Sequence, residues 1–179
     1  IKVEDIKPKI NNDFLWGSWT TIRAKSIYED TLAMNISDID SMTYQAIWEY
    51  KKGQEINSED LQLAIDQKQK CLNQIDSIFG NFDFLALPSA QIFPFDKNLQ
   101  FPTSINNIEL DTYHRWLEVF ILSSLLHLPT FTIPVGFNRN GLPMGVQIIA
   151  RNKDDLKLFS FVSKYEKVFN YSKIKPKLS

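Results

Sequence analysis

The sequence has 179 residues, of which 44% are hydrophobic and 23% are charged, and its formal net charge is −1. This length suits one domain with a hydrophobic core, or part of a larger domain, and the composition is that of a soluble globular protein. The charge balance gives no support for nucleic-acid binding, and the longest apolar run, residues 119–128, is too short for a membrane-spanning helix of about 20 residues.

The first two predicted elements are helices. Residues 11–34 carry apolar side chains at helical spacing, with Gly17 as a weak point. Residues 37–53 predict a second helix that follows Asp and Ser caps and stops at Gly53. The stripe that we expect the first helix to bury consists of Phe14, Leu15, Trp19, Ile22 and Ile27.

The clearest helix is predicted for residues 57–80, where Asn57 or Ser58 can cap the start and Gly80 ends the helix. Cys71 lies on its apolar face and is expected to be a small core residue. Because Cys71 is the only cysteine, no intrachain disulfide can form, and a reducing, cytoplasmic compartment is predicted. The full stripe is Leu61, Ala64, Ile65, Cys71, Leu72, Ile75, Ile78 and Phe79.

The apolar period changes after this helix. Residues 83–90, DFLALPSA, form a short apolar run closed by a proline, which is typical of a buried strand. A Pro- and Phe-rich loop is predicted for residues 91–107. Asp111 or Thr112 can cap the next helix, which is apolar nearly all round as far as Leu128, so we expect it to be buried.

Two apolar arms around a polar turn follow. The arms, PTFTIPVGF and PMGVQIIA, suit strands, and Asn140-Gly141 supplies the turn of a hairpin. Residues 152–169 predict an amphipathic closing helix, whose start is favoured by the acidic pair Asp154-Asp155. Its apolar face contains Leu158, Phe159, Val162, Tyr165 and Phe169.

The order of elements predicts an α/β fold in which helices are layered on a sheet. Three strands make a thin sheet for helices this apolar, so we expect the chain to be part of a larger sheet. It begins with Ile1 rather than Met, which also suggests a piece of a longer polypeptide. No repeat or low-complexity linker is present, so residues 1–179 are expected to contain no internal domain boundary.

The sequence offers few metal ligands. His114 and His127 are the only histidines and match no metal-binding spacing, so no metal site is predicted. His114 can pair with Glu118 at the surface, and His127 is expected at a helix end near the last carbonyls. The six glycines form no phosphate-binding loop, so no nucleotide and no cofactor is predicted.

No complete catalytic constellation is found. Ser123-Ser124 lie three residues before His127, yet leucines flank them in a predicted helix, where their hydroxyls bond the preceding turn. A nucleophile needs an exposed turn beside oxyanion-binding amides instead. We therefore assign no catalytic residue in this chain.

An ordered set of motifs is nonetheless specific. The strand that ends in Pro-Ser is followed by a helix, then by a strand of the form Pro-x-Gly, a Gly-Leu-Pro turn, a Gly-Val-Gln strand and a closing helix with Tyr-Glu. This arrangement resembles the C-terminal portion of amidase signature enzymes over residues 14–169, most strongly from Asp83 onward. The matching residues are Pro88-Ser89, Pro129, Pro134, Gly136, Gly141-Leu142-Pro143, Gly145-Val146-Gln147 and Tyr165-Glu166.

The resemblance implies that the hairpin supplies the last two strands of a large mixed sheet covered by helices. Pro134 and Pro143 would then limit edge pairing at the strand margins. Gly136 and Gly145 would permit backbone bends or close approach. Gln147, in an apolar strand, would be a structural hydrogen-bonding residue. One departure is His127, where the family usually has Gly.

The resemblance also implies a chemistry. These enzymes use a serine nucleophile, a second serine in a cis peptide and a lysine to hydrolyse carboxamide C–N bonds. No segment here matches those that carry these residues, so we expect them in an N-terminal part of the same fold, and we expect this segment alone to be inactive. Tyr113, His114, Trp116 and Ser89 are the predicted substrate-binding residues, as one wall of the acyl pocket.

The expected ligand is a small-molecule amide, and a homo-oligomer stays open. The stretches YHRW and QIFPFD resemble a bacterial subgroup of simple amidases. Two alternatives remain: a protein like the A subunit of an amidotransferase, which transfer RNA dependence would reveal, and a truncated, noncatalytic structural or binding protein. The reading frame upstream of Ile1 separates the last alternative from a fragment.

Overall fold

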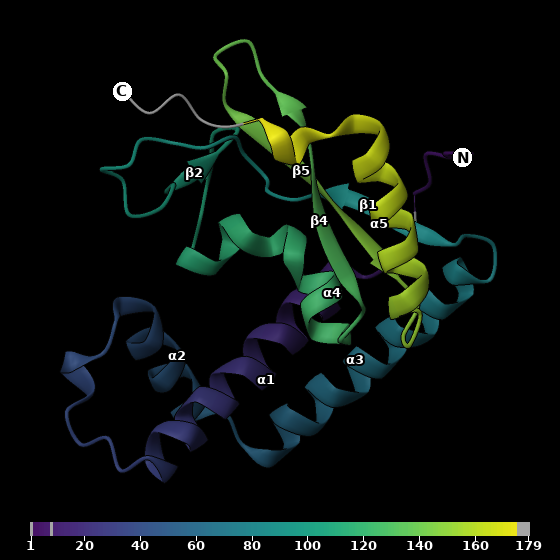
Figure 1. Cartoon of the computed structure of the whole chain (residues 1–179). Helices are drawn as coiled ribbons and strands as arrows, with labels where there is room; N and C mark the ends of the chain where they lie inside the picture. The colour runs from purple at the N-terminus through teal and green to yellow at the C-terminus, as the bar shows by residue number, and fades with distance from the viewer. Residues whose placement is uncertain (1, 8, 175–179) are drawn as a thin grey trace. The chain divides into compact units, whose positions relative to one another are not determined.

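The computed structural model describes residues 2–7 and 9–174 (Figure 1). Tertiary contacts divide the chain into two compact units, Ile1–Gly80 and Asn81–Ser179, and each is described by itself. The prediction that residues 1–179 contain no internal domain boundary stays a prediction. The layering of helices on a sheet is confirmed by the elements below.

The first unit is helical. It contains α1 (Asn12–Ala33), a short 3-10 helix, η1 (Ile39–Ser41), α2 (Tyr44–Glu55) and α3 (Ser58–Phe79), and α1 packs against both α2 and α3 (Figure 1). Asn57 is the cap of α3: its side chain accepts from the amides of Glu59 and Asp60, and the Asp60 carboxylate accepts from the Asn57 amide. This reciprocal pair satisfies amides that would otherwise lack partners at the helix start.

The buried face of α1 differs from the predicted stripe. Of the five predicted residues only Leu15 is buried, and the others are partly exposed. The buried positions are mostly small: Leu15, Ser18, Thr20, Ala24 and Thr31. Small side chains let neighbouring helices approach closely, so the packing of α1 follows side-chain size rather than hydrophobicity alone.

Gly53 does not stop its helix, as the sequence predicted, because α2 continues to Glu55. The glycine is buried where α2 crosses α1. A Cβ atom at this position would lie 2.1 Å from the carbonyl oxygen of Ala24 and 2.7 Å from the Cβ of Tyr28. Gly53 therefore allows two helices to approach each other closely, and it does not end a helix.

Cys71 is confirmed as a core residue, with an exposed fraction of 0%. Burial raises the pKa of its thiol above the ordinary value of 9.0, because the thiolate is poorly solvated there.

Because the pKa of the Cys71 thiol is higher in the folded chain than in the unfolded chain, the contribution of this thiol to the free energy of unfolding is complete below pH 9.0. It is lost as the pH rises through the folded pKa. We expect the free energy of unfolding to fall above that pH in urea titrations, and less steeply in Cys71→Ala. An equally steep fall in the variant would contradict this.

The second unit contains a three-stranded sheet, a small hairpin and helices. The sheet has the order β1-β5-β4 with antiparallel pairing throughout, and β2 pairs with β3. The strands are β1 (Phe84–Pro88), β2 (Ser104–Ile105), β3 (Ile108–Glu109), β4 (Thr130–Phe137) and β5 (Pro143–Ala150). The helices are η2 (Tyr113–Phe120), α4 (Ile121–Leu126), α5 (Asp155–Phe169) and η3 (Tyr171–Lys173).

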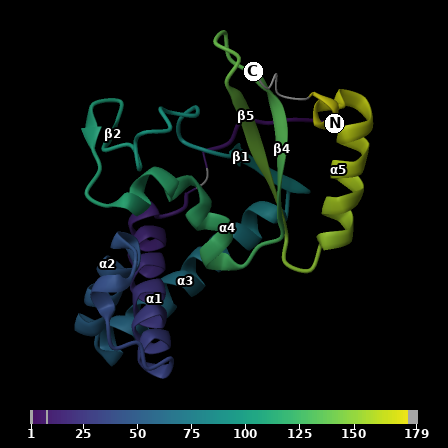
Figure 2. The same ribbon diagram turned by 60° about the vertical axis from the view of Figure 1, so that its left-hand side comes forward.

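β5 is the central strand, and both of its faces are covered. On one face α5 lies against the sheet, and on the other face lie η2 and α4 (Figure 2). The core on the α5 side consists of Ile133, Ile148, Ala150, Leu158 and Val162. Burial on both faces explains why residues 147–150 are buried without alternation.

β1 is correctly predicted as a strand but not as a buried one. It lies at an edge of the sheet, and Ala86 and Pro88 are exposed.

The segment that the sequence predicts as a loop, residues 91–107, contains the start of a hairpin formed by β2 and β3. Asn106 and Asn107 form its turn with φ of 51° and 64°, left-handed values that asparagine tolerates better than most residues.

The single helix predicted before Leu128 is two helices. Thr112 caps a 3-10 helix, η2, whose end at Phe120 leads directly into α4. In a 3-10 helix, residues three apart lie on the same side, so Tyr113 and Trp116 face together, with ring centroids 6.3 Å apart. The buried part of the predicted helix is mainly α4, in which Ser124 is the one exposed residue.

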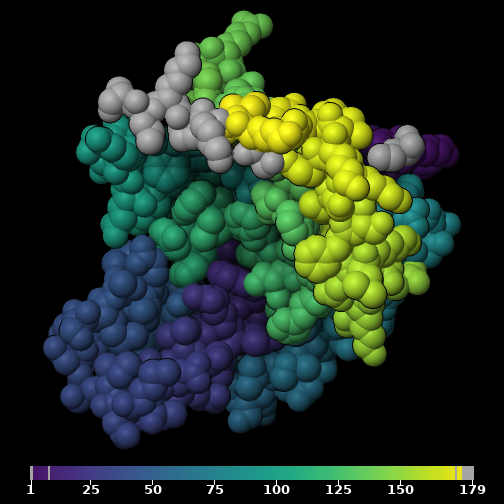
Figure 3. Space-filling view, viewed as in Figure 1, coloured from purple at the N-terminus to yellow at the C-terminus, as the bar shows by residue number. Residues whose placement is uncertain are grey.

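The turn between β4 and β5 is built by Asn138. Its side chain accepts hydrogen bonds from the amides of Asn140 and Leu142, and Gly141 adopts a φ of 76°. The hairpin tip projects from the surface of its unit (Figure 3). Pro143 begins β5 as expected, but Pro134 lies inside β4 next to a bulge, where Gly136 has a φ of 141°.

His127 occupies the end of α4 in a left-handed conformation, with φ 52° and ψ 41°. Because a Cβ atom disfavours this conformation and glycine tolerates it, His127→Gly is expected to stabilise the second unit by about 0.5–1 kcal/mol. His127→Ala keeps the Cβ and is the control that gains nothing. Urea denaturation of both variants checks this, and an equal gain in His127→Ala would contradict the conformational explanation.

Among the described residues, no helix combines the length and the apolar character needed to cross a membrane.

Candidate functional site

Gln147 joins three segments beneath the candidate site. Its side chain is fully buried, and its Nε2 donates to the carbonyl oxygens of Pro88 and Val119, each at 2.9 Å. Its Oε1 accepts from the Ser123 hydroxyl at 3.3 Å. The predicted structural role of Gln147 is therefore confirmed: it ties β5 to the end of β1 and to the junction of η2 with α4.

Gly145 provides the close approach predicted for it. The amide of Ser89 donates to the carbonyl oxygen of Gly145 at 3.0 Å, which extends the pairing of β1 and β5 by one residue. A Cβ atom on Gly145 would lie 2.7 Å from the Ser89 Oγ and 3.0 Å from the carbonyl oxygen of Ile133. Ser89 thus lies directly over the backbone of β5.

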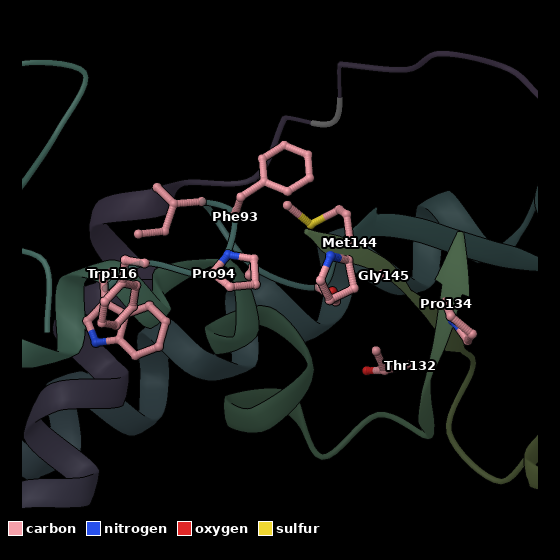
Figure 4. A pocket seen from close by; sticks show the side chains of 12 residues that line it. Phe93, Pro94, Trp116, Thr132, Pro134, Met144 and Gly145 are labelled. Carbon is pink, nitrogen blue, oxygen red and sulfur yellow. The ribbon is translucent and has the colours of Figure 1, made fainter. Parts of the chain in front are cut away.

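A pocket of about 500 Å³ begins at this point (Figure 4). Four parts of the second unit line it: the segment after β1, η2, β4 and the start of β5. In Figure 4, Trp116 and Pro134 lie at opposite ends of the lining, with Phe93 and Met144 between them. The lining residues, none of them charged, are Ser89, Ala90, Ile92, Phe93, Pro94, Phe95, Trp116, Thr132, Pro134, Pro143, Met144 and Gly145.

Two of the four predicted substrate-binding residues line the pocket, and two do not. Ser89 and Trp116 line the pocket. Tyr113 and His114 do not, although the Tyr113 ring contacts the rings of both His114 and Trp116 edge-on. The binding roles of all four residues stay predictions.

Several lining residues were missed by reasoning from the sequence. Phe93 and Phe95 were assigned to a loop without a role, and Met144 was treated as part of a strand. The available signal was the density of aromatic residues in QIFPF, directly after a strand. Phe95 packs edge-on against Trp116, with centroids 5.6 Å apart, so this loop is held against η2.

The expected surface pair of His114 and Glu118 is wrong. His114 is buried, with an exposed fraction of 4%, whereas Glu118 pairs with Arg115, which also contacts Asp111. In the part of the chain that the structure describes, no group of three or more His, Cys, Asp or Glu side chains could hold a metal ion.

Ser123 behaves as the sequence predicted. Its hydroxyl donates to the carbonyl oxygen of Phe120 in the preceding turn at 3.2 Å and also reaches Gln147. The side chain is buried and engaged in the structural network described above. It is not arranged as a nucleophile, which needs access to substrate and a neighbouring base.

The family profile described as Amidase matches residues 24–159, well over half of the chain. The chain belongs to the amidase family.

Two solved structures share the fold of this amidase chain. A bacterial aryl acylamidase of the amidase signature family has a TM-score of 0.80 at 18% identity, over 94% of this chain and 37% of that one. A 6-aminohexanoate cyclic dimer hydrolase, complexed with substrate, has a TM-score of 0.77 at 17% identity, over 97% and 39%.

Curated relatives of this amidase chain are amidotransferase subunits. The A subunit of the glutamyl-tRNA(Gln) amidotransferase of Orientia tsutsugamushi (strain Boryong) is 32% identical over 101 residues, which is 55% of this chain and 19% of that protein. The corresponding mitochondrial protein of Schizosaccharomyces pombe (strain 972 / ATCC 24843) is 31% identical over 91 residues, or 51% and 17%. The chain therefore spans about a fifth of the length of these relatives.

Proposed function

We propose that this chain is the C-terminal part of an amidase that hydrolyses a carboxamide C–N bond, and that its pocket forms one wall of the acyl site. The observation that carries the proposal is the uncharged pocket at the end of β1, within a chain that belongs to the amidase family. Pockets of this kind, apolar with a few hydroxyl groups, are typical of small-molecule sites.

The chemistry is proposed to lie in an N-terminal part of the same fold. There, a serine hydroxyl adds to the amide carbonyl, a second serine and a lysine relay its proton to the departing amine, and the C–N bond breaks. Water then cleaves the resulting ester to release the acid, while backbone amides stabilise the negative oxygen. This segment would position the substrate and would not hydrolyse it alone.

The experiment is hydrolysis of a panel of aliphatic and aromatic amides by this chain and by the product of its full reading frame. Activity confined to the longer protein is the expected result. Turnover by the 179 residues, abolished in Ser123→Ala or Ser124→Ala, would place the nucleophile in this chain and overturn the proposal. Inactivity of the longer protein towards every amide would instead favour a noncatalytic structural or binding protein.

A second candidate is an amidotransferase subunit, because the two curated relatives described above carry that name. Such a protein would transfer ammonia within a complex and would depend on transfer RNA. Amide hydrolysis by the longer protein without any RNA or partner chain favours the simple amidase. Activity that appears only with a charged transfer RNA favours the second candidate.

The cellular setting is also a proposal. The single, buried cysteine is compatible with a reducing, cytoplasmic compartment. The motifs YHRW and QIFPFD support a bacterial source. Size-exclusion chromatography of the longer protein would show whether it is a homo-oligomer.

A further inference from the structure

We propose that the pocket selects an uncharged, apolar group of the amide substrate, about as large as a phenyl ring, and rejects groups that carry an ammonium or a carboxylate. This inference rests on the proposed hydrolysis of amides, and it names the class of substrate. It follows from the composition, the aromatic walls and the hydrogen-bonding capacity of the lining.

The pocket lining is uncharged. Among the residues that the structure describes, no acidic or basic side chain lines it, and the side-chain hydroxyls in the lining belong to Ser89 and Thr132. A charged group that lies against such a lining gives up part of its hydration and finds no opposite charge there, which is unfavourable. A neutral hydrocarbon group gains free energy from the same burial.

The lining also contains aromatic rings suited to a guest ring. Phe95 and Trp116 stand at 90° to each other, and Phe93 and Met144 line the same pocket. Edge and face positions around a guest ring are the arrangements that aromatic groups prefer, and methionine adapts to irregular guests. The volume of about 500 Å³ exceeds that of one ring, so a substituted or branched group also fits.

The uncharged lining also distinguishes the two proposed functions. An amino-acid amide such as glutamine brings an α-ammonium and a carboxylate, and the described lining can pair with neither. The pocket therefore favours a hydrolase of simple neutral amides over an enzyme that handles free amino acids.

The test uses two probes that differ by one charge. 3-Phenylpropanamide and phenylalaninamide share a carbon skeleton, but below about pH 6 the second carries an α-ammonium. Binding to the 179-residue chain is followed by NMR at the indole N–H of Trp116 and the methyl group of Met144. We expect the neutral probe to bind about tenfold more tightly or better. Equal or tighter binding of phenylalaninamide would overturn the proposal.

Two variants assign the effect to the pocket. Phe93→Ala removes part of the aromatic wall and should weaken binding of the neutral probe about fivefold, whereas Phe137→Ala, an exposed aromatic residue outside the lining, should leave it unchanged. Met144→Glu introduces a carboxylate and should make phenylalaninamide the preferred probe. An unaltered preference in Met144→Glu would overturn the assignment, because a merely structural role of Met144 would not change the sign of the selectivity.

Hydrolysis by the longer reading-frame product keeps the two proposals distinct. Selective binding of the neutral probe, combined with inactivity towards every amide of the panel, would retain this inference and overturn the hydrolase. Hydrolysis of phenylalaninamide as fast as of 3-phenylpropanamide would retain the hydrolase and overturn this inference. The isomers phenylacetamide and acetanilide, with the ring on the acyl or the amine side, show which side the pocket takes: a preference for phenylacetamide supports the acyl wall, and the reverse overturns that assignment.

Discussion

Replacing Gly53 by alanine is expected to destabilise the helical unit by about 3 kcal/mol. The added Cβ would lie 2.1 Å from the carbonyl oxygen of Ala24, so the backbones of α1 and α2 would have to move apart. This cost exceeds the gain of about 1 kcal/mol that alanine normally brings to a helix interior. Urea denaturation followed by far-ultraviolet circular dichroism measures the change.

Gly17→Ala is the matched control, because Gly17 also lies inside a helix. Its added Cβ would meet only the Gln67 Oε1, at 3.9 Å, an ordinary contact. We therefore expect this variant to be more stable than the parent by up to about 1 kcal/mol. If both variants were stabilised, α1 and α2 would not approach as closely as the structure shows.

Gln147→Leu is expected to destabilise the second unit by about 3–4 kcal/mol. The leucine matches the glutamine in size, but it removes the two donors that reach the carbonyl oxygens of Pro88 and Val119. Those part-buried oxygens lose a partner, and an acceptor that is shielded from water and has no partner is costly. Chemical denaturation, monitored at Trp116 by NMR, reports on this unit.

Two further variants separate hydrogen bonding from packing at this position. Ser123→Ala deletes the longest of the three bonds of Gln147, together with the bond from the Ser123 hydroxyl to Phe120, and should cost about 1 kcal/mol. Gln147→Glu keeps the shape but cannot donate when ionised, so it should be at least as damaging as Gln147→Leu. A well-tolerated Gln147→Glu would show that side-chain volume, not donation, is what this position requires.

Much of the local structure could be predicted from residue patterns. The helix over residues 58–79, its cap at Asn57 and the hairpin strands follow from periodicity, capping chemistry and turn residues, which act over a few positions. The structural role of Gln147 could also be predicted from the sequence, since an amide side chain in an apolar strand must find hydrogen-bond partners. The order and spacing of the motifs near the end of the chain were enough to indicate the amidase family.

The predictions that the structure contradicts share a cause. The sequence pattern predicts a helix end at Gly53, whereas this glycine marks a crossing with a residue 29 positions earlier, Ala24. The apolar run of β1 predicts a buried strand, because such a run does not reveal whether a second neighbour pairs with it. The helix before Leu128 was not divided, since the aromatic contacts that accompany η2 come from Phe95 and Phe101 in another segment.

The candidate site likewise combines residues that the sequence could single out with residues that only the structure brings together. Trp116 and Ser89 could be singled out as unusual residues beside a helix start and a strand end, but the pocket also needs Phe93, Thr132 and Met144 from three other places in the sequence. By itself, the sequence determined the order of the main helices and strands and indicated the family, because both depend on patterns among neighbouring residues. Only the tertiary structure decided which side chains meet, because contacts between distant segments depend on strand pairing and helix packing that no local pattern contains.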